Sequence, residues 1–265
     1  YIAFTEYQPW VPILESPFVG LENFRLMFTA PDFGRLVFNT VWINILKLVF
    51  GFPAPIILAL LLNEVQKQVF KRTFQTISYL PYFVSWIVVS GIMYTLLNYN
   101  FGIVNGLLKS FGMEPVQWYT SNQYWRSFLV GTSVWKSIGY NSILYLAAIA
   151  GIDTALYEAA VMDGANRWKQ TLHVTLPGIL PIVMLMSILA MGNIFNAGFD
   201  QIFNMYSPQV YSTGDILDTL VYRIGMLDAQ YGVATAIGLF KSVISFAMLG
   251  ISYMVAYKYT DYRVF

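Results

Sequence analysis

The sequence has no cysteine and little charge. Without cysteine, the 265-residue chain can form neither a disulfide nor a thiolate metal site. Charged residues make up only 11% of it, whereas a soluble domain carries about 25%. The net charge is +1, and no stretch gathers enough Lys and Arg to follow a phosphate backbone. This composition argues against a soluble domain and against a nucleic-acid-binding protein.

Catalytic signatures are missing as well. The pattern GxxxxGK[ST] does not occur, so the sequence contains no P-loop for ATP. Neither HExxH nor GxSxG is present, and the single histidine, His173, cannot form a metal cluster by itself. We therefore expect a protein that is not an enzyme and that holds no cofactor or metal of its own.

Long apolar runs fill most of the chain. Hydrophobic residues make up 57% of the sequence and the mean hydropathy is +0.56. A helix needs about 20 apolar residues to cross a bilayer. We predict an all-α, multi-pass membrane protein. Its five complete spans are expected at about 36–62, 76–97, 127–152, 176–199 and 233–257.

The distribution of basic residues sets the orientation. Residues 64–75, 153–173 and the tail from 258 hold seven Lys and Arg in about 40 residues, whereas the other loops hold five in about 100. The first set is therefore expected in the cytoplasm. Because five spans place the two chain ends on opposite sides, we expect a sixth span, ahead of the other five, in the intact protein.

A polar stretch, residues 157–181, lies between two of these apolar runs. It opens with helix formers such as Ala159 and Ala160, and Gly164 stands where a left-handed residue would end a short helix. Pro177 can then start the next helix. A loop that only connects two spans needs none of these features. They favour a short surface helix offered to a partner.

The same stretch resembles the EAA loop of binding-protein-dependent ABC importer permeases. The matching residues are Glu158-Ala159-Ala160, Gly164, Val174 in place of the usual isoleucine, and Leu176-Pro177. With Asp163, Ala165 and Pro181, the stretch is similar to carbohydrate permeases of the maltose and glycerol-phosphate type. Gly20-Leu21-Glu22-Asn23-Phe24 resembles a segment that the same permeases carry before their core spans. Further segments resemble a branch for oligosaccharides and pectin- or alginate-type fragments, namely Phe70-Lys71-Arg72, 147–152 and 238–242.

This resemblance implies a type I ABC importer transmembrane domain in a bacterial cytoplasmic (inner) membrane. The chain would work with a second permease subunit, two ATPase subunits that bind ATP and Mg, and an extracytoplasmic solute-binding protein that delivers an oligosaccharide. Residues 1–35 would hold the end of a first span and an external segment, residues 36–258 the permease core, and 259–265 a cytoplasmic tail.

The resemblance also implies that the coupling helix lies at about residues 153–165, in a cleft of the ATPase, with Asp153 as its N-terminal cap. Closure of the ATPases would move this helix and switch the spans between inward- and outward-facing states. The residues expected to contact the ATPase are Glu158, Ala159, Ala160, Asp163, Gly164 and Ala165.

Candidates for the substrate pathway come from polar and aromatic residues inside spans, which are costly unless they face protein or water. A saccharide uses hydrogen-bonding amides and flat aromatic faces. The candidates are Trp135, Tyr140, Asn141, Tyr145, Asn193, Asn196 and Phe199, with Trp86, Tyr94 and Asn44 as weaker ones. We expect Asn193 and Asn196 on one helix face. The alternative is that these residues belong to an interfacial belt or join helices.

Three lysines, Lys47, Lys136 and Lys241, lie within apolar runs, where a cation is costly enough to suggest a role. Lys136 and Lys241 could meet an anionic sugar or an acidic residue of the partner, and Lys136 could equally reach a nearby interface. Because all 14 acidic residues are expected in loops or at span edges, these cations favour an acidic saccharide.

A secondary, ion-coupled solute transporter is the alternative function. Such a carrier usually has carboxylates within its spans as a proton relay, together with inverted repeats. The expected positions of the acidic residues provide no relay, and no repeat is visible in the sequence.

Overall fold

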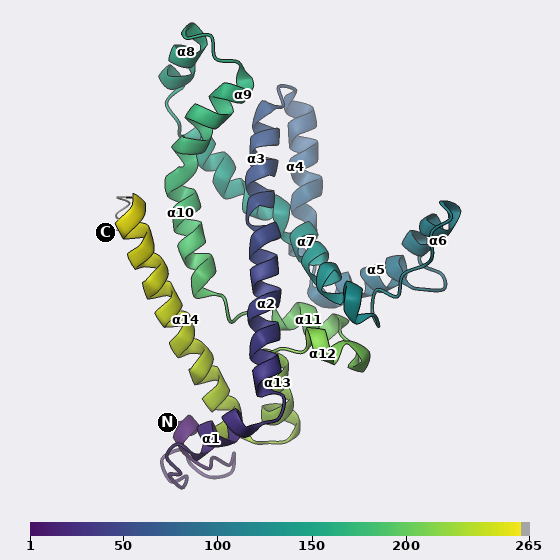
Figure 1. Ribbon diagram of the computed structural model, residues 1–265, viewed down its shortest axis with the longest axis vertical. Helices are drawn as coiled ribbons and strands as arrows, with labels where there is room; N and C mark the ends of the chain where they lie inside the picture. Colours follow the sequence, from purple (N-terminus) through teal and green to yellow (C-terminus); the bar gives the residue numbers. More distant parts are fainter. Residues whose placement is uncertain (261–265) are drawn as a thin grey trace. The chain divides into compact units, whose positions relative to one another are not determined.

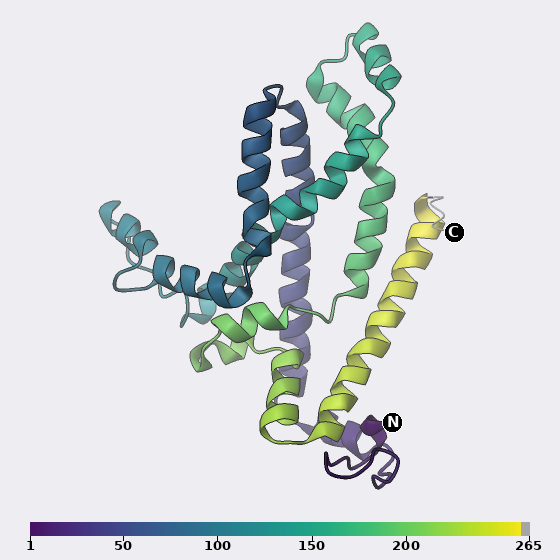
Figure 2. The same cartoon turned by 180° about the vertical axis from the view of Figure 1, so that it is seen from behind.

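The computed structural model describes residues 1–260, and helices dominate this range (Figures 1 and 2). Within it, β pairing is limited to an isolated bridge between Thr5 and Phe18. The all-α prediction is confirmed. The predicted tail, residues 259–265, lies beyond the part of the chain whose side chains are described.

The α-helices are α1 (Glu22–Thr29), α2 (Phe33–Gly51), α3 (Pro53–Glu64), α4 (Gln68–Phe83), α5 (Trp86–Leu97), α6 (Ile103–Ser110), α7 (Asn122–Ala150), α8 (Thr154–Met162), α9 (Arg167–Gln170), α10 (Leu176–Gly192), α11 (Phe199–Met205), α12 (Tyr211–Gly214), α13 (Leu217–Tyr222) and α14 (Tyr231–Thr260). Short 3-10 turns are η1 (Ile2–Phe4) and η3 (Pro208–Val210), and π-helical turns are η2 (Thr171–Thr175) and η4 (Arg223–Leu227).

Three of the described helical runs are long and apolar enough to cross a membrane, namely Phe33–Glu64, Arg167–Gly192 and Tyr231–Lys258. The count rises to five if α4 with α5, and α7 with α8, are each taken as one bent span. The five apolar runs of the sequence therefore all fold as helices.

The prolines of the first span do not interrupt it. Gly51 ends α2 and Pro53 opens α3, while Phe52 between them keeps helical angles of φ −79° and ψ −46°. The first position of a helix tolerates proline because its N–H has no acceptor within the helix there. Residues 33–64 consequently form one helical run.

The predicted end of the fourth span is wrong, whereas its predicted start at about residue 176 matches the first residue of α10. The helix ends at Gly192 instead of Phe199, and α9 with the π-helical turn extends the helical run back to Arg167, ahead of Pro177. The π-helical turn Thr171–Thr175 lies just before Pro177. A wider turn suits a proline inside a helix, because the ring has no N–H to donate and would crowd the carbonyl four residues earlier.

The chain divides into two compact units. The first unit contains Tyr1–Ile45, Ser85–Leu129 and Gly192–Met248, and the second contains Leu46–Val84, Val130–Met191 and the chain from Leu249. The loops predicted to be external all lie in the first unit. The loops at 64–75 and 153–173, predicted to be cytoplasmic, lie in the second.

The apolar core of the first unit joins α1, α2, α13 and α14. Its buried residues are Met27, Phe33, Leu36, Phe195, Leu217, Val233 and Ile237. Phe240 of α14 packs edge-on against Phe28, Phe33 and Phe195, with ring centroids 5.6 to 6.2 Å apart. Aromatic side chains contribute large buried areas to such a core.

A polar network fastens the loop at residues 200–232 to α2 and α7 of the same unit. The buried Asn39 amide donates to the carbonyls of Ser212 and Asp215, both at 3.1 Å, and Arg126 donates to Asn39 Oδ1 at 2.8 Å. The Arg223 guanidinium forms two hydrogen bonds to the Asp215 carboxylate, at 2.9 and 2.6 Å. These bonds to Asp215 raise the pKa of Arg223 above its ordinary value. Its charge is therefore permanent.

The second unit has its own core between α3, α7 and α10, formed by Ala59, Tyr145, Ile149 and Ile179. Two glycines allow close helix contacts there. A methyl group at Gly178 would lie 2.7 Å from Ile152 Cδ1, and one at Gly139 would overlap the carbonyl of Ser78 in α4. The close approach of α7 to α4 therefore depends on Gly139.

Candidate functional site

The predicted surface helix is present as α8, and both of its ends are capped. The Asp153 carboxylate accepts a hydrogen bond from the Ala155 N–H at 2.9 Å, as predicted for the N-terminal cap. At the other end Gly164 has a φ of +73°, which confirms the predicted left-handed residue. These local contacts define the length of the helix.

The C-terminal end of α8 is a Schellman motif. The Gly164 N–H donates to the Val161 carbonyl at 2.9 Å, and the Ala165 N–H donates to the Ala160 carbonyl at 2.8 Å. Asn166 then caps α9 through a hydrogen bond from the Lys169 N–H at 2.9 Å. The polar loop is thus a chain of defined turns with little free backbone.

Two side-chain contacts fix α8 and α9 to the rest of the second unit. The Tyr157 hydroxyl lies 2.9 Å from the Thr175 hydroxyl in the π-helical turn. Arg167 Nη1 lies 2.8 Å from Glu64 Oε2 at the end of α3. Sequence reasoning missed both pairs, because their members are far apart in the chain and no local pattern joins them.

No residue of α8 is buried within the described chain, which leaves the helix open to a partner. Among the predicted contact residues, Glu158, Ala159, Asp163 and Gly164 are exposed, and Ala160 and Ala165 are half-buried. Large apolar side chains accompany them. Their exposed fractions are 55% for Leu156, 58% for Val161, 87% for Met162 and 73% for Trp168.

The candidates on α7 differ in their surroundings. Trp135, Tyr140 and Asn141 are exposed, and the Tyr140 ring stacks on Tyr82 of α4 with centroids 3.8 Å apart. Tyr145 is only 3% exposed and packs in the core of the second unit. Its position argues against direct contact with a substrate.

Lys136 is bound within the chain. Its ammonium lies 3.1, 2.6 and 2.7 Å from the carbonyl oxygens of Pro81, Tyr82 and Val84, where α4 ends. The last carbonyls of a helix have no donors within it, and a cation near them is stabilising. The prediction that Lys136 meets an anionic sugar or reaches the interface does not fit this geometry.

Asn193 and Asn196 do not share a helix face, because α10 ends at Gly192 and both follow it in a turn segment. Their backbone carbonyls accept hydrogen bonds from the Asn44 amide of α2 at 2.6 and 3.2 Å. Gly198, with a φ of +89°, then leads into α11. The expected helix-face pair is therefore a wrong prediction.

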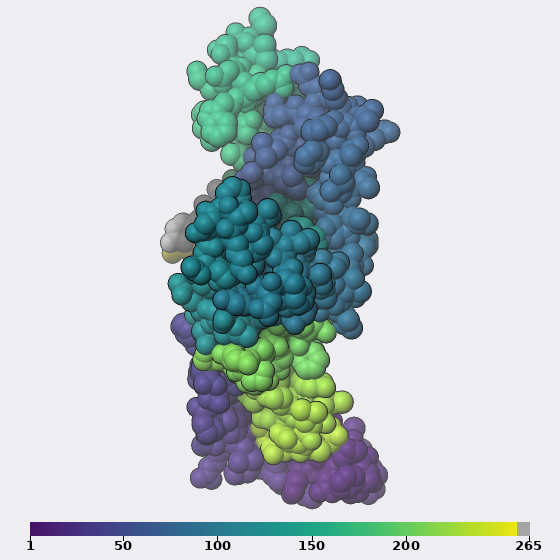
Figure 3. All heavy atoms as spheres, turned by 90° about the vertical axis from the view of Figure 1, so that its right-hand side faces the viewer, coloured from purple at the N-terminus to yellow at the C-terminus, as the bar shows by residue number. Residues whose placement is uncertain are grey.

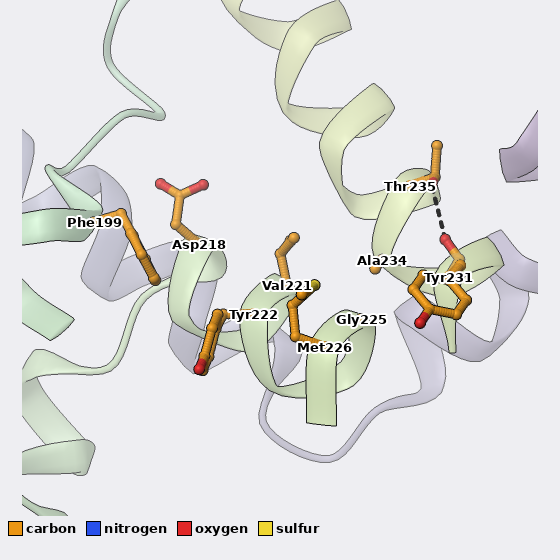
Figure 4. Close-up of a pocket in the computed structure, with 9 residues that line it drawn as sticks. All are labelled: Phe199, Asp218, Val221, Tyr222, Gly225, Met226, Tyr231, Ala234 and Thr235. Atoms are coloured by element: carbon orange, nitrogen blue, oxygen red, sulfur yellow. Dashed lines mark hydrogen bonds between the residues drawn. The ribbon is translucent and has the colours of Figure 1, made fainter. Parts of the chain in front are cut away.

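Phe199 lines a cavity of about 470 Å³ in the first unit (Figure 4). Tyr222 and Asp218 of α13 also line it, as do Met226 and Tyr231. Lys241 of α14 pairs with the Asp218 carboxylate. The expectation that this lysine is available to an acidic saccharide overlooked Asp218, which lies 23 positions earlier in the sequence.

Among the described residues, no group of three His, Asp or Glu side chains is arranged to hold a metal ion. The chain's distinctive features are instead a multi-pass helical body, a capped and exposed helix on a polar loop, and aromatic and amide side chains along its helices. These features are those of a membrane-spanning protein with a surface helix open to a partner.

Comparison with known proteins identifies the family. The chain belongs to the binding-protein-dependent transport system inner membrane components, and the match covers residues 51–264. It is therefore a multi-pass permease subunit of the cytoplasmic (inner) membrane. This assignment supports the ABC importer over the ion-coupled carrier.

Similar proteins cover the chain almost completely. Protein LplB of Bacillus subtilis is 40% identical over 100% of this chain and 83% of its own length. The polygalacturonan/rhamnogalacturonan transport system permease protein YteP of the same organism is 37% identical over 100% and 82%. A crystal structure of a bacterial alginate ABC transporter, in complex with a periplasmic protein bound to an alginate pentasaccharide, contains a chain with a TM-score of 0.89 and 37% identity. This match covers 92% of this chain and 85% of that one.

Proposed function

We propose that the chain moves an acidic oligosaccharide into the cytoplasm, as one of two permease subunits in an ATP-driven importer. The names of YteP and of the similar transporter structure refer to polygalacturonan and alginate, both polymers of uronic acids. Identity above 35% over nearly the whole chain supports a related substrate here. The length and composition of the saccharide would follow from its solute-binding protein.

In this proposal α8 is the coupling helix, and two separate ATPase subunits bind ATP and Mg. The observation that carries the assignment is a helix fixed at both ends yet fully open on its outer face. A rigid element can transmit movement from a partner, since its displacement is not absorbed by bending of the loop. Glu158 supplies a carboxylate, and Ala159 allows close approach.

We propose Trp135, Tyr140, Asn141 and Phe199 as pathway residues. Their rings and amide suit the CH faces and hydroxyls of a sugar. Lys136 binds backbone carbonyls and Lys241 pairs with Asp218. We therefore assign neither lysine to recognition of the saccharide's charge. The second permease would supply the facing half of the pathway.

The proposal is tested by purifying the chain from its native membrane in detergent and identifying the proteins that accompany it. An ATPase with a Walker motif, a second permease and a solute-binding protein are expected. A chain that purifies alone and transports without nucleotide would contradict the proposal.

Charge reversal on α8 tests the coupling assignment. In the assembled importer, Glu158→Lys should abolish the increase in ATP hydrolysis caused by loaded binding protein, while the thermal midpoint stays unchanged because Glu158 is exposed. Glu15→Lys, the same change at an exposed site in the predicted external segment, is the control. Normal stimulation in Glu158→Lys would show that α8 is not the coupling element.

A further inference from the structure

A second cavity, of about 260 Å³, lies in the first unit and is distinct from the one beside Phe199. It is formed by the end of α5 and by two parts of the loop predicted to be external. Its lining residues are Tyr94, Leu97, Asn98, Tyr99, Asn100, Gln117, Trp118, Tyr119 and Thr120. No charged residue is among them.

The chemistry of this lining is that of a saccharide site. Four aromatic rings offer flat faces to the CH side of a pyranose, and three amides and four hydroxyls, three of them on tyrosines, can both donate to and accept from sugar hydroxyls. The Tyr94 and Tyr99 rings are 53% and 42% exposed and hence accessible. An acyl chain would require a continuous apolar groove, and a phosphate would require a site lined by cations. This cavity has neither lining.

The Trp118 ring is a fixed wall of the cavity. The residue is half-buried and its ring packs against Tyr124 with ring centroids 5.9 Å apart, while its indole N–H is covered by protein atoms. The ring therefore contributes a flat face, and not a hydrogen-bond donor, to a sugar in the cavity.

The walls of the cavity are held in place by a buried residue that does not line it. The amide of Asn105, only 1% exposed, donates to the carbonyls of Asn98 and Val116 at 3.1 and 3.0 Å. Its oxygen accepts from the Val116 N–H at 2.9 Å. Asn105 thereby ties both sides of the loop together, so that the lining is formed before any ligand arrives.

The loop also rests on the segment that follows α11. The Ser207 hydroxyl donates to the Tyr119 carbonyl at 3.0 Å, and the Asn122 amide donates to the Gln209 carbonyl at 3.1 Å. Figure 3 shows the teal atoms of the loop adjoining the green atoms of residues 199–214. The cavity therefore stands on packed structure within the first unit.

We propose that this cavity is an external saccharide subsite, which binds one end of the oligosaccharide before it enters the spans. The inference rests on the proposed function and adds a second site to it. Pockets for drug-sized ligands measure about 300–1,000 Å³, so a cavity of about 260 Å³ suits one or two sugar rings. Because the cavity has no charged groups, it would bind ring faces and hydroxyls. The carboxylates of the saccharide would be recognised at other sites.

Photolabelling of the complete importer tests the subsite directly. The photoreactive residue p-benzoylphenylalanine replaces Tyr99, and the assembly is illuminated with radiolabelled trigalacturonate. Replacement of Phe111 is the control, because this ring is 80% exposed in the same loop but does not line the cavity. We expect labelling at position 99 that excess unlabelled trimer removes, and none at position 111. Equal labelling at both positions, or no labelling at 99, would overturn the subsite.

Trp118→Ala refines the test, since it removes one aromatic wall of the cavity. We expect the trimer concentration for half-maximal labelling at position 99 to rise about fivefold, as for the loss of one aromatic contact. An unchanged concentration would remove Trp118 from the site.

ATP-driven trimer uptake, measured on the same preparation without the photoreactive residue, separates the two proposals. Uptake without labelling contradicts the subsite alone, whereas labelling without uptake contradicts the proposed function alone.

Discussion

At the scale of single residues, the intramembrane lysines show how an unusual side chain can have a structural role. Lys136 is a lone cation in an apolar run, which is what is expected of a residue that recognises an acidic substrate. Its ammonium instead binds three carbonyls at the end of α4, and Tyr82, whose carbonyl is one of them, stacks on Tyr140. We interpret Lys136 as a residue that positions this aromatic pair.

Lys136→Met should therefore destabilise the protein without changing its preference for charge. Removal of the ammonium takes a charged donor from three carbonyls at the end of α4. A hydrogen bond to a charged group is worth about 1.5–3 kcal/mol, so the thermal midpoint in detergent should fall. Uptake of acidic and neutral oligosaccharides should change by the same factor. Lys136→Arg, which keeps donors and charge, should retain more stability. A selective loss of acidic substrates would contradict the positioning role.

Residue-level features were predictable when their cause was local. Asp153 and Gly164 act on backbone within a few positions of themselves, so their roles could be inferred from order in the sequence. The partners of Lys136 and Lys241 come from other helices. Tyr145 faces a core rather than an open surface for the same reason, because only tertiary packing determines which side of α7 is covered.

At the scale of elements, apolar runs located the spans but not their ends. The start of α9 at Arg167 depends on the Asn166 cap, and the passage through Pro177 depends on a π-helical turn. α10 ends at Gly192, and the Asn44 amide of α2 donates a hydrogen bond to the carbonyl of the next residue, Asn193. Hydropathy reports none of these contacts, which explains why the end of the fourth span was misplaced.

The crossing of α7 and α4 predicts opposite effects for two glycines of one helix. Gly139→Ala would place a methyl group on the Ser78 carbonyl, and overpacking costs about 1–3 kcal/mol. Gly131→Ala meets nothing within 4 Å and should instead add stability of about 0.5–1 kcal/mol from helix propensity. Thermal midpoints of the two variants check the pair. A stable Gly139→Ala protein would show that α7 and α4 do not approach this closely.

The attachment of α8 predicts a local change when its tyrosine is altered. Tyr157→Phe removes the hydrogen bond to Thr175, which is worth about 1 kcal/mol. Backbone amides of residues 154–162 should then exchange with deuterium severalfold faster, while amides of α14 are unaffected. The exposed Tyr124→Phe serves as control. Unchanged exchange in α8 would mean that the Tyr157 hydroxyl does not hold the helix.

At the scale of the whole molecule, composition and one loop determined the class of protein. Little charge and five long apolar runs indicated a membrane protein, and the capped helix between two spans indicated a partner. The family match over residues 51–264 agrees with both. In our proposal, the substrate is selected by a few side chains from several helices and from a second subunit. The sequence of one chain therefore indicates the class of substrate only through similar proteins.

The central claim is that transport through this chain is driven by ATP hydrolysis in a partner. It is tested most directly by reconstituting the purified assembly in liposomes with its binding protein and measuring uptake of a radiolabelled uronic-acid oligosaccharide. We predict uptake that requires ATP on the ATPase side, is unaffected by collapse of ion gradients, and is lost in Glu158→Lys. Uptake by the chain without its partners, driven by a proton or sodium gradient and insensitive to ATP, would contradict the account.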